Sequence, residues 1–391
     1  CTAVATPAGC PIVAIETFVA KPAQPNASNV HGTNVAAIAV GSAPDAGVAV
    51  LDVFSDAGAL SSDVIAAINW SIANRAGLNI VAINLSLGDA SHHVSQCGAS
   101  VFASPVTNAR TAGLHVAAAA GNRAYESGVF TAGVSDPACV PGALSVGAVY
   151  DSNIGGVAWS VCTDSTSAAD KVACFSNTAS YLGLLAPGAV VTAGGATLGG
   201  TSQATPHVSG ALAVLRAAFP NETLATIEAR LGANGTPVTD PRNGQVNPRL
   251  NLRAAARPVN DDFDSAIVVA GSSGSTTGDN RLATHETGEP QPAAAATQSV
   301  WWRWTAPAAG QVSLDTLGSG FDTRLDVYTG SAVGALAVVA GNDNADGASL
   351  GSALRFQAVA GTSYRWAIDS SDGGAGSTTL QWSLNTNAQA N

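Results

Sequence analysis

Short apolar runs that alternate with helical patterns characterise the first two thirds of the chain. The runs lie at Val48–Phe54, Ile80–Leu87, Leu114–Ala120 and Leu144–Val149. They are bounded by Gly, Asp or Asn and show no strict alternation, which is typical of parallel strands buried on both faces. Between the first two, Ser61–Ala76 repeats apolar residues at helical spacing. This order predicts an α/β fold with a parallel sheet covered by helices on both faces.

The ends of the helix at Ser61–Ala76 can also be predicted from its residues. Ser61 or Ser62 is placed to cap the first turn, because a serine hydroxyl can accept a hydrogen bond from a free backbone N–H. Gly77 follows directly and can adopt the left-handed conformation that ends many helices.

The pattern changes near residue 257, where we place a boundary between domains at residues 1–257 and 258–391. Beyond it the chain is rich in Gly, Ser and Thr, and short alternating segments such as Val300–Thr305 are separated by turn residues. This pattern predicts an all-β sandwich or jelly roll. Trp302 and Trp304 share one face of a strand, which favours a place in the sandwich core over a carbohydrate-stacking surface.

Two further motifs invite a metal-binding interpretation. Asn342–Gly347 partly matches a calcium loop, but the twelfth position is Ala353 rather than Glu, which excludes an EF-hand. We expect a turn there, with an irregular calcium site as the alternative. The adjacent residues His92 and His93 are expected in a solvated loop rather than as a ligand pair, because successive side chains diverge.

Composition favours a folded, exported protein. Hydrophobic residues make up 46% of the chain, which argues against disorder. A net charge of −11 without a basic stripe argues against nucleic acid or an anionic membrane as partner. No apolar run reaches the roughly 18 residues of a membrane span. The absence of methionine and the six cysteines fit an oxidising, extracellular location. Because the chain begins with Cys rather than Met, we expect it to be processed or incomplete at its front.

The cysteines fall into three neighbourhoods along the chain, and none has the spacing of a zinc site. Six cysteines allow 15 pairings, so sequence alone leaves the connectivity open. Our hypothesis is the sequential pairing Cys1–Cys10, Cys97–Cys139 and Cys162–Cys174.

Three segments carry the groups that acyl transfer needs, namely a nucleophile, a base and an oxyanion donor. Ser202 follows a Gly pair and starts an apolar helix, where free N–H groups and the helix dipole favour negative charge. Pro206 is then expected within the first turn. His31 opens a helix of small residues, and Asn122 comes just after a predicted strand.

These segments closely resemble the subtilisin-like serine proteases over about residues 10–255. The resemblance rests on His31-Gly-Thr-Asn-Val-Ala, on Ala-Ala-Gly-Asn122, and on Gly-Thr-Ser202-Gln-Ala-Thr-Pro. It implies a secreted serine endopeptidase that acts on proteins or peptides through an acyl-enzyme. His31 would be its general base, Ser202 its nucleophile and Asn122 its oxyanion donor. The chemistry would need no cofactor, and a structural calcium ion is compatible with the resemblance.

The resemblance also implies a substrate-binding region. Its residues are Asn84, Leu85, Ser86, Leu87, Gly88, Ala118, Ala119 and Gly121. Small residues along Ala117–Ala120 favour an open pocket for a large apolar side chain before the cut bond. The segment from Asn260 onward resembles the pre-peptidase C-terminal domains of secreted bacterial proteases.

One departure from the family concerns the carboxylate that orients the histidine. The family has an Asp on a strand upstream of the histidine, whereas Glu16 is the one carboxylate before His31 here. Either an Asp-bearing strand precedes Cys1 on another piece of polypeptide, such as a cleaved N-terminal fragment, or Glu16 replaces it. The 15-residue separation of Glu16 from His31 favours the first alternative.

The departure also defines a rival hypothesis, a catalytically incomplete binding protein with the same fold. An α/β-hydrolase is disfavoured, because Gly200–Ala204 lacks the second Gly of G-x-S-x-G.

Overall fold

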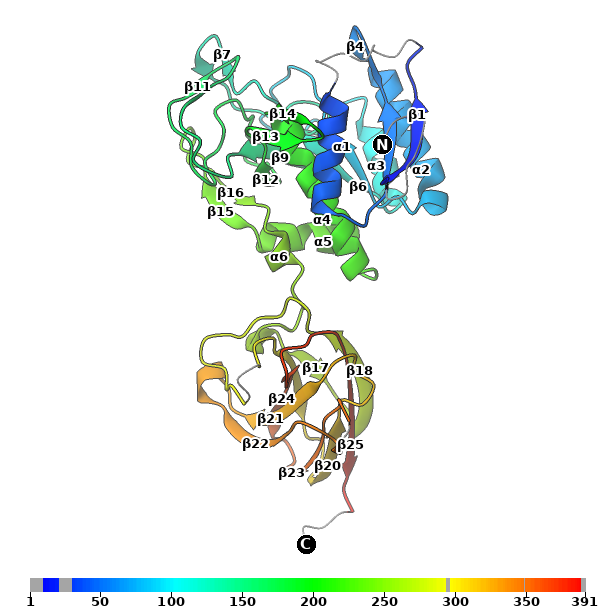
Figure 1. Ribbon diagram of the computed structural model, residues 1–391, viewed down its shortest axis with the longest axis vertical. Coiled ribbons are helices and arrows are strands. Elements are labelled where there is room, and N and C mark those ends of the chain that lie inside the picture. The colour runs from blue at the N-terminus through cyan, green and yellow to red at the C-terminus, as the bar shows by residue number, and fades with distance from the viewer. Residues whose placement is uncertain (1–9, 21–29, 293–295, 348, 388–391) are drawn as a thin grey trace. The chain divides into compact units, whose positions relative to one another are not determined.

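The chain forms two compact units, which divide after Ala255. The computed structural model describes residues 10–20, 30–292, 296–347 and 349–387 (Figure 1). None of the helices within these ranges is both long enough and apolar enough to cross a bilayer.

A six-stranded sheet forms the centre of the first unit. In spatial order its strands are β15 (Thr236–Thr239), β16 (Val246–Arg249), β12 (Leu184–Pro187), β9 (Leu144–Val149), β6 (His115–Ala119) and β5 (Ala82–Leu85). All neighbours from β16 to β5 pair in parallel, and only β15 is antiparallel. Every residue of β6 is buried, as expected for a strand covered on both faces. The prediction of a parallel α/β sheet is confirmed.

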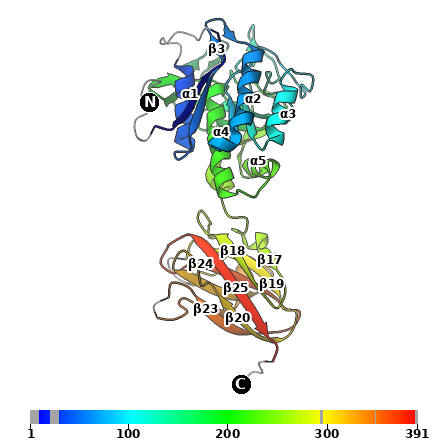
Figure 2. The same cartoon turned by 90° about the vertical axis from the view of Figure 1, so that its right-hand side faces the viewer.

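Helices cover both faces of this sheet (Figure 2). On one face, α2 (Ser61–Leu78) and α3 (Ala103–Thr111) contribute to a core that includes Val116 and Ala118 of β6. Successive strand residues point to opposite faces of a sheet, so each strand has a second face to cover. That face is covered by α4 (Thr201–Ala218), which contacts β5, β6, β9 and β12. Three further helices are α1 (His31–Ser42), α5 (Leu224–Ala233) and α6 (Leu252–Ala255).

The expected caps of α2 are wrong at both ends. The hydroxyl of Ser62 donates to Asp63 Oδ1, and no side chain caps the helix start. Gly77 lies inside the helix, which ends at Leu78, and Asn79 takes the left-handed conformation with φ 50°. Asn tolerates this region better than most residues do, so it serves as well as a glycine.

Two N-terminal strands stand apart from the central sheet. The strands β1 (Ile12–Thr17) and β2 (Val48–Asp52) form a parallel pair of their own. Over the described residues no ladder connects β2 with β5, the edge strand of the central sheet. Every residue of β2 is only half-buried, so the burial expected for the run Val48–Phe54 is wrong over β2, whereas Val53 is buried. Among the described strands, β2 has a neighbour on one side only, which leaves its other edge uncovered by a strand.

Short hairpins complete the first unit. They are β3–β4 (Phe54–Ser55 and Gly58–Ala59), β7–β8 (Tyr125–Glu126 and Val129–Phe130), β10–β11 (Val157–Ala158 and Thr163–Asp164) and β13–β14 (Val191–Ala193 and Ala196–Leu198).

The second unit consists of two sheets that share one core. The first contains β17 (Ile267–Val269), β19 (Val300–Thr305), β24 (Ser363–Ser370), β21 (Thr323–Thr329) and β22 (Ala337–Asn342). The second contains β18 (Ser273–Asp279), β25 (Ser377–Asn385), β20 (Gly310–Asp315) and β23 (Ala353–Ala358). Two single 3₁₀ turns lie at Phe263–Ser265 and Val333–Ala335.

The tryptophans of β19 behave as the sequence predicts. Trp302 and Trp304 are fully buried in the shared core together with Trp366 and Trp382. They therefore offer no surface on which a sugar could stack. After Asn342 the chain forms a turn, in which Asn342 Oδ1 accepts a hydrogen bond from the Ala353 N–H at 3.1 Å.

Two of the three expected disulfides are present, namely Cys97–Cys139 and Cys162–Cys174. The pairing of Cys1 with Cys10 remains a prediction, because Cys1 lies outside the described residues.

Candidate active site

The helices α1 and α4 lie side by side in the first unit (Figures 1 and 2). Near the helix starts, Gln203 Nε2 donates to Asn34 Oδ1 at 3.2 Å. Farther along, Ser42 Oγ lies 3.2 Å from His207 Nδ1. From the first contact to the second, the residue number increases in both helices, so the two helices run parallel. His31 and Ser202, which occupy their first turns, therefore share one end of the pair.

Ser202 is positioned by reciprocal hydrogen bonds with Ser86, which follows β5. The Ser202 hydroxyl donates to the Ser86 carbonyl oxygen at 3.1 Å, and the Ser86 hydroxyl donates to the Ser202 carbonyl oxygen at 2.7 Å. The second bond has a clear cause. Pro206 is the sixth residue of α4 and has no N–H, so the Ser202 carbonyl lacks its usual helical partner. The expectation that Pro206 lies in the first turn is therefore wrong, and Ser86 supplies the missing donor.

The side chain of Asn122 is oriented by Thr201, the residue before Ser202. Asn122 Oδ1 accepts hydrogen bonds from the Thr201 N–H at 2.7 Å and from the Thr201 hydroxyl at 2.9 Å. A backbone N–H can only donate, so the Asn122 atom that it meets must be the oxygen. The amide NH₂ has no hydrogen-bond partner among the described residues, and Asn122 as a whole is exposed. A Cβ on Gly200 would lie 3.0 Å from that nitrogen, so glycine keeps the space open.

Thr201 is a site residue that the sequence analysis missed. Its buried hydroxyl also accepts a hydrogen bond from the Gly121 N–H at 3.0 Å, so it holds the whole turn that carries Asn122. Gly121 itself adopts φ +109°, and a Cβ there would collide with the Ser135 hydroxyl. The one sequence signal for Thr201 is its place inside the Gly-Thr-Ser motif.

The expected substrate-binding residues lie around this network, but not all of their side chains are available. Leu85 and Ala118 point into the core beneath α2 and α3, so a substrate could reach only their backbone. Ala119 is buried, whereas Leu87 is half-buried and Gly88 is exposed. Asn84 Nδ2 donates to Ser86 Oγ at 2.9 Å, which fixes the serine that meets Ser202.

Glu16 shows no interaction with His31 within the described part of the chain. It is exposed on β1, where it pairs in register with Leu51 of β2. Burial alone lowers the pKa of His31, and no carboxylate among the described residues acts on it. A lowered pKa keeps the imidazole neutral at neutral pH, so it can accept a proton. The geometry therefore favours the alternative in which the orienting carboxylate lies elsewhere.

His207 has the structural role expected of it. Its contact with Ser42 connects α4 to α1, and burial lowers its pKa to about 4.

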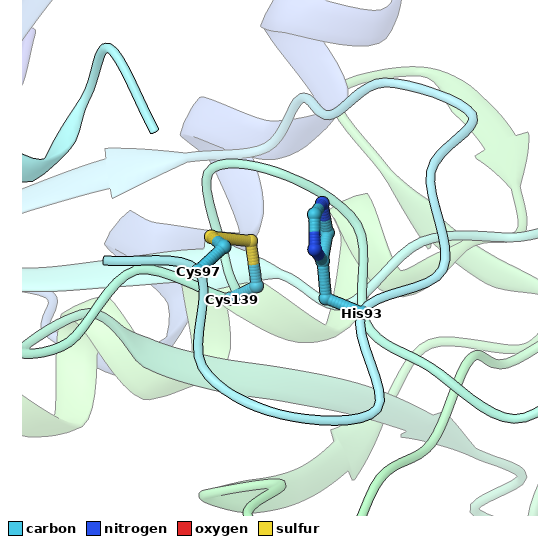
Figure 3. Close-up of side chains that lie close together, drawn as sticks. All are labelled: His93, Cys97 and Cys139. Carbon is cyan, nitrogen blue, oxygen red and sulfur yellow. A yellow bond between two sulfur atoms is a disulfide. The ribbon is translucent and has the colours of Figure 1, made fainter. Parts of the chain in front are cut away.

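The candidate metal ligands do not form a usable centre. His93, Cys97 and Cys139 bring their ligand atoms within 4.8 Å of one another (Figure 3). Both sulfurs are joined in a disulfide, so neither is available as a thiolate ligand. His92 and His93 are half-buried rather than solvated, contrary to expectation. The backbone of His93 pairs with Val134, and His92 Nε2 lies 3.4 Å from Glu126 Oε1.

Comparisons with known proteins agree on one family. The profile of the subtilase family matches residues 12–247. Subtilisin E of Bacillus subtilis (strain 168) is 34% identical over 221 residues, which are 53% of this chain and 50% of the relative. The subtilisin-like serine protease Pen ch 13 of Penicillium rubens is 34% identical over 203 residues, or 48% of this chain and 44% of the relative.

The chain thus spans about half the length of the curated relatives it matches. Among solved structures, a cold adapted subtilisin-like serine proteinase shows 29% sequence identity and a TM-score of 0.47. That match covers 62% of this chain and 81% of the other.

Proposed function

This chain belongs to the subtilase family, and we propose that it is a secreted serine endopeptidase. The observation that supports this most directly is the shared position of His31 and Ser202 at one end of two parallel helices, beside the free amide of Asn122. Protein or peptide chains are the substrates that this arrangement fits. The chemistry needs no cofactor, because a hydroxyl, an imidazole and fixed hydrogen-bond donors suffice for acyl transfer.

The proposed reaction has two halves. In the first, Ser202 Oγ attacks the peptide carbonyl carbon while His31 takes the hydroxyl proton. The Asn122 amide and the Ser202 N–H donate to the oxygen that becomes negative. His31 then gives the proton to the leaving amine, the C–N bond breaks, and an acyl-enzyme remains. In the second half, water repeats these steps and frees Ser202.

We further propose that the orienting carboxylate comes from a strand outside the described residues. Two features support this. First, β2 is half-exposed along its whole length, although strands of such sheets are normally buried. Second, β5 ends the central sheet with its outer edge unpaired by any described strand, and it carries Ser86 to the nucleophile. A strand between β2 and β5 would unite both pieces of sheet.

A fluorophosphonate probe tests the proposed nucleophile, because it reacts only with an activated serine. We expect labelling at Ser202 in the wild-type protein, and none in the variants Ser202→Ala and His31→Ala. The variant Glu16→Gln should label as fast as the wild type. If folded protein from the intact precursor remains unlabelled, the rival hypothesis of a non-catalytic binding protein with this fold is favoured. If Glu16→Gln abolishes labelling, Glu16 is the orienting residue after all.

For the second unit, we propose an accessory β-sandwich of the pre-peptidase C-terminal type. Its two sheets with a common core of tryptophans support this assignment. A variant ending at Ala255 should keep fluorophosphonate labelling if the second unit is an accessory, and should lose it if the second unit completes the site.

A further inference from the structure

Two buried amide side chains connect the helix that begins with His31 to the helix that carries Ser202. Asn34 of α1 has an exposed fraction of 0%, and Gln203 of α4 has one of 2%. Gln203 Nε2 donates to Asn34 Oδ1 at 3.2 Å. Burying a polar group is unfavourable unless it is hydrogen-bonded, so apolar side chains would be the simpler way to pack two helices here. The polar pair therefore points to a requirement beyond packing.

The orientation of the Asn34 amide is fixed by a second element, the hairpin β13–β14. Asn34 Nδ2 donates to the carbonyl oxygens of Ala193 and Ala196, both at 3.0 Å. Carbonyl oxygens can only accept, so the atom that they meet is the nitrogen, and Oδ1 is left to face Gln203. Gln203 must then donate, which settles the orientation of its own amide as well.

The same hairpin packs closely against the first turn of α1 (Figure 1). A Cβ on Gly194 would lie 2.9 Å from the Thr33 carbonyl oxygen, a distance that a side chain could not keep without a shift of the backbone. Only Gly199 and Gly200 separate the end of β14 from the start of α4. Asn34 is therefore held from two sides by one continuous segment, and that segment leads directly to the nucleophile.

The amide pair also lies close in sequence to both proposed reacting groups. Asn34 comes three residues after His31, on the same side of α1, and Gln203 directly follows Ser202. The contact of Ser42 with α4 lies about two helical turns farther along the pair. Of these two polar contacts between the helices, the amide pair is thus the one at the reacting end.

The position of the His31 ring depends on where α1 lies against α4, because no carboxylate in the described part of the chain acts on the ring. A general base must be within hydrogen-bond reach of the proton that it takes, and a displacement of about 1 Å can slow a reaction roughly 100-fold. Hydrogen bonds are strong in a buried, low-dielectric environment, so a network whose members all have partners is rigid. The contacts of Asn34 can therefore keep the two helices at a constant separation.

We propose that Asn34 and Gln203 are positioning residues, which hold the first turns of α1 and α4 at the separation that lets the His31 imidazole take the proton of Ser202. Neither side chain needs to touch the substrate for this role. The inference rests on the proposed endopeptidase function for its consequence in the reaction, whereas the hydrogen bonds themselves do not depend on that function.

The kinetic test compares two variants of the same helix pair. Gln203→Met keeps the length of the side chain but removes the donor, and Ser42→Ala weakens the far end as a matched control. We expect Gln203→Met to lower kcat and the rate constant of fluorophosphonate labelling about tenfold, with KM nearly unchanged, because the base is displaced while the acyl group is still bound. Ser42→Ala should keep the wild-type rate constant.

The labelled fraction at completion separates positioning from stability. A loss of stability alone lowers the fraction of protein that can be labelled, but it leaves the rate constant of the folded molecules unchanged. Equal rate constants for the wild type and Gln203→Met would overturn the inference. Gln203→Leu takes the place of Gln203→Met if the latter does not fold.

A double-mutant cycle with Asn34→Ala tests whether the two amides act as a unit. Because either change breaks the same hydrogen bond, the doubly changed protein should be labelled about as slowly as Asn34→Ala alone. Losses that multiply would show that the two side chains act independently, and would also overturn the inference.

Titration of the His31 ring by nuclear magnetic resonance separates this inference from the reaction, because it needs no turnover. Burial lowers the pKa of His31 from its ordinary value of 6.5. Gln203→Met should loosen α1, expose the ring and raise this pKa toward 6.5, whereas Ser42→Ala should leave it unchanged. An unchanged His31 pKa in Gln203→Met would overturn the inference even if the enzyme is active. A raised pKa in a protein that a fluorophosphonate never labels would refute only the endopeptidase function.

Discussion

The hydrogen bond from Ser86 to the Ser202 carbonyl should be coupled energetically to Pro206. Because Pro206 has no N–H, Ser86→Ala leaves that carbonyl without its donor at 2.7 Å. An unsatisfied, partly buried carbonyl costs about 1–3 kcal/mol. In a Pro206→Ala background the new N–H can complete the helical bond, so the same Ser86→Ala change should cost at least about 1 kcal/mol less.

Thermal unfolding of the four proteins in this double-mutant cycle measures the coupling. For a unit of this size, 1 kcal/mol corresponds to about 2–4 °C in Tm. Ser86→Ala should therefore lower Tm by roughly 2–12 °C alone, and by clearly less beside Pro206→Ala. Ser71→Ala is a matched control, because its buried hydroxyl donates to the Ala67 carbonyl in α2, away from Pro206. Equal losses from Ser86→Ala in both backgrounds would refute the idea that Ser86 replaces the missing N–H.

Three other outcomes follow from the described contacts. Thr201→Val should lose about 1–3 kcal/mol of stability and slow fluorophosphonate labelling, while Thr201→Ser should preserve both, because the hydroxyl is the part of the Thr201 side chain that bonds Gly121 and Asn122. The pKa of His207 falls from 6.5 unfolded to about 4 folded, so its contribution is present above pH 6.5 and is lost as the pH falls toward 4. Urea titrations should show a loss of up to about 3 kcal/mol over this window, with a smaller loss in His207→Gln. Replacing both Cys162 and Cys174 by Ser opens a loop with a sequence separation of 12 and should cost about 3 kcal/mol, measured as a lower Tm.

Local sequence patterns were enough to predict a compact strand and the site residues that lie at the start of a helix or shortly after the end of a strand. Leu144–Val149 forms a strand over the bounds expected, because a compact run of apolar residues leaves little choice of register. Asn122 follows a strand of small residues, and His31 begins a helix, as their motifs indicate. In each case the determining residues are neighbours in the chain.

The contacts that complete the site could not be predicted in this way. Ser86 and Ser202 are 116 positions apart, and Gly121 and Thr201 are 80 apart. The motifs mark Ser86 and Thr201 as neighbours of the site, but their hydrogen-bond partners become evident only when the sheet and α4 bring these residues together. The half-burial of β2 is likewise a property of its neighbours, since its own residues are as apolar as those of a buried strand.

The described residues therefore position the groups that would act on the acyl group more completely than the groups that would transfer the proton. Ser202, Thr201 and Asn122 are connected through α4, β5 and β6, so the proposed nucleophile and the proposed oxyanion donors are fixed before a substrate binds. His31 has burial but no described carboxylate to orient or stabilise its protonated form. Positioned donors act on the acyl group, whereas an orienting carboxylate acts on proton transfer. A carboxylate supplied by another strand should consequently raise kcat far more than it lowers KM, because the part of the site that holds the acyl group is already complete without it.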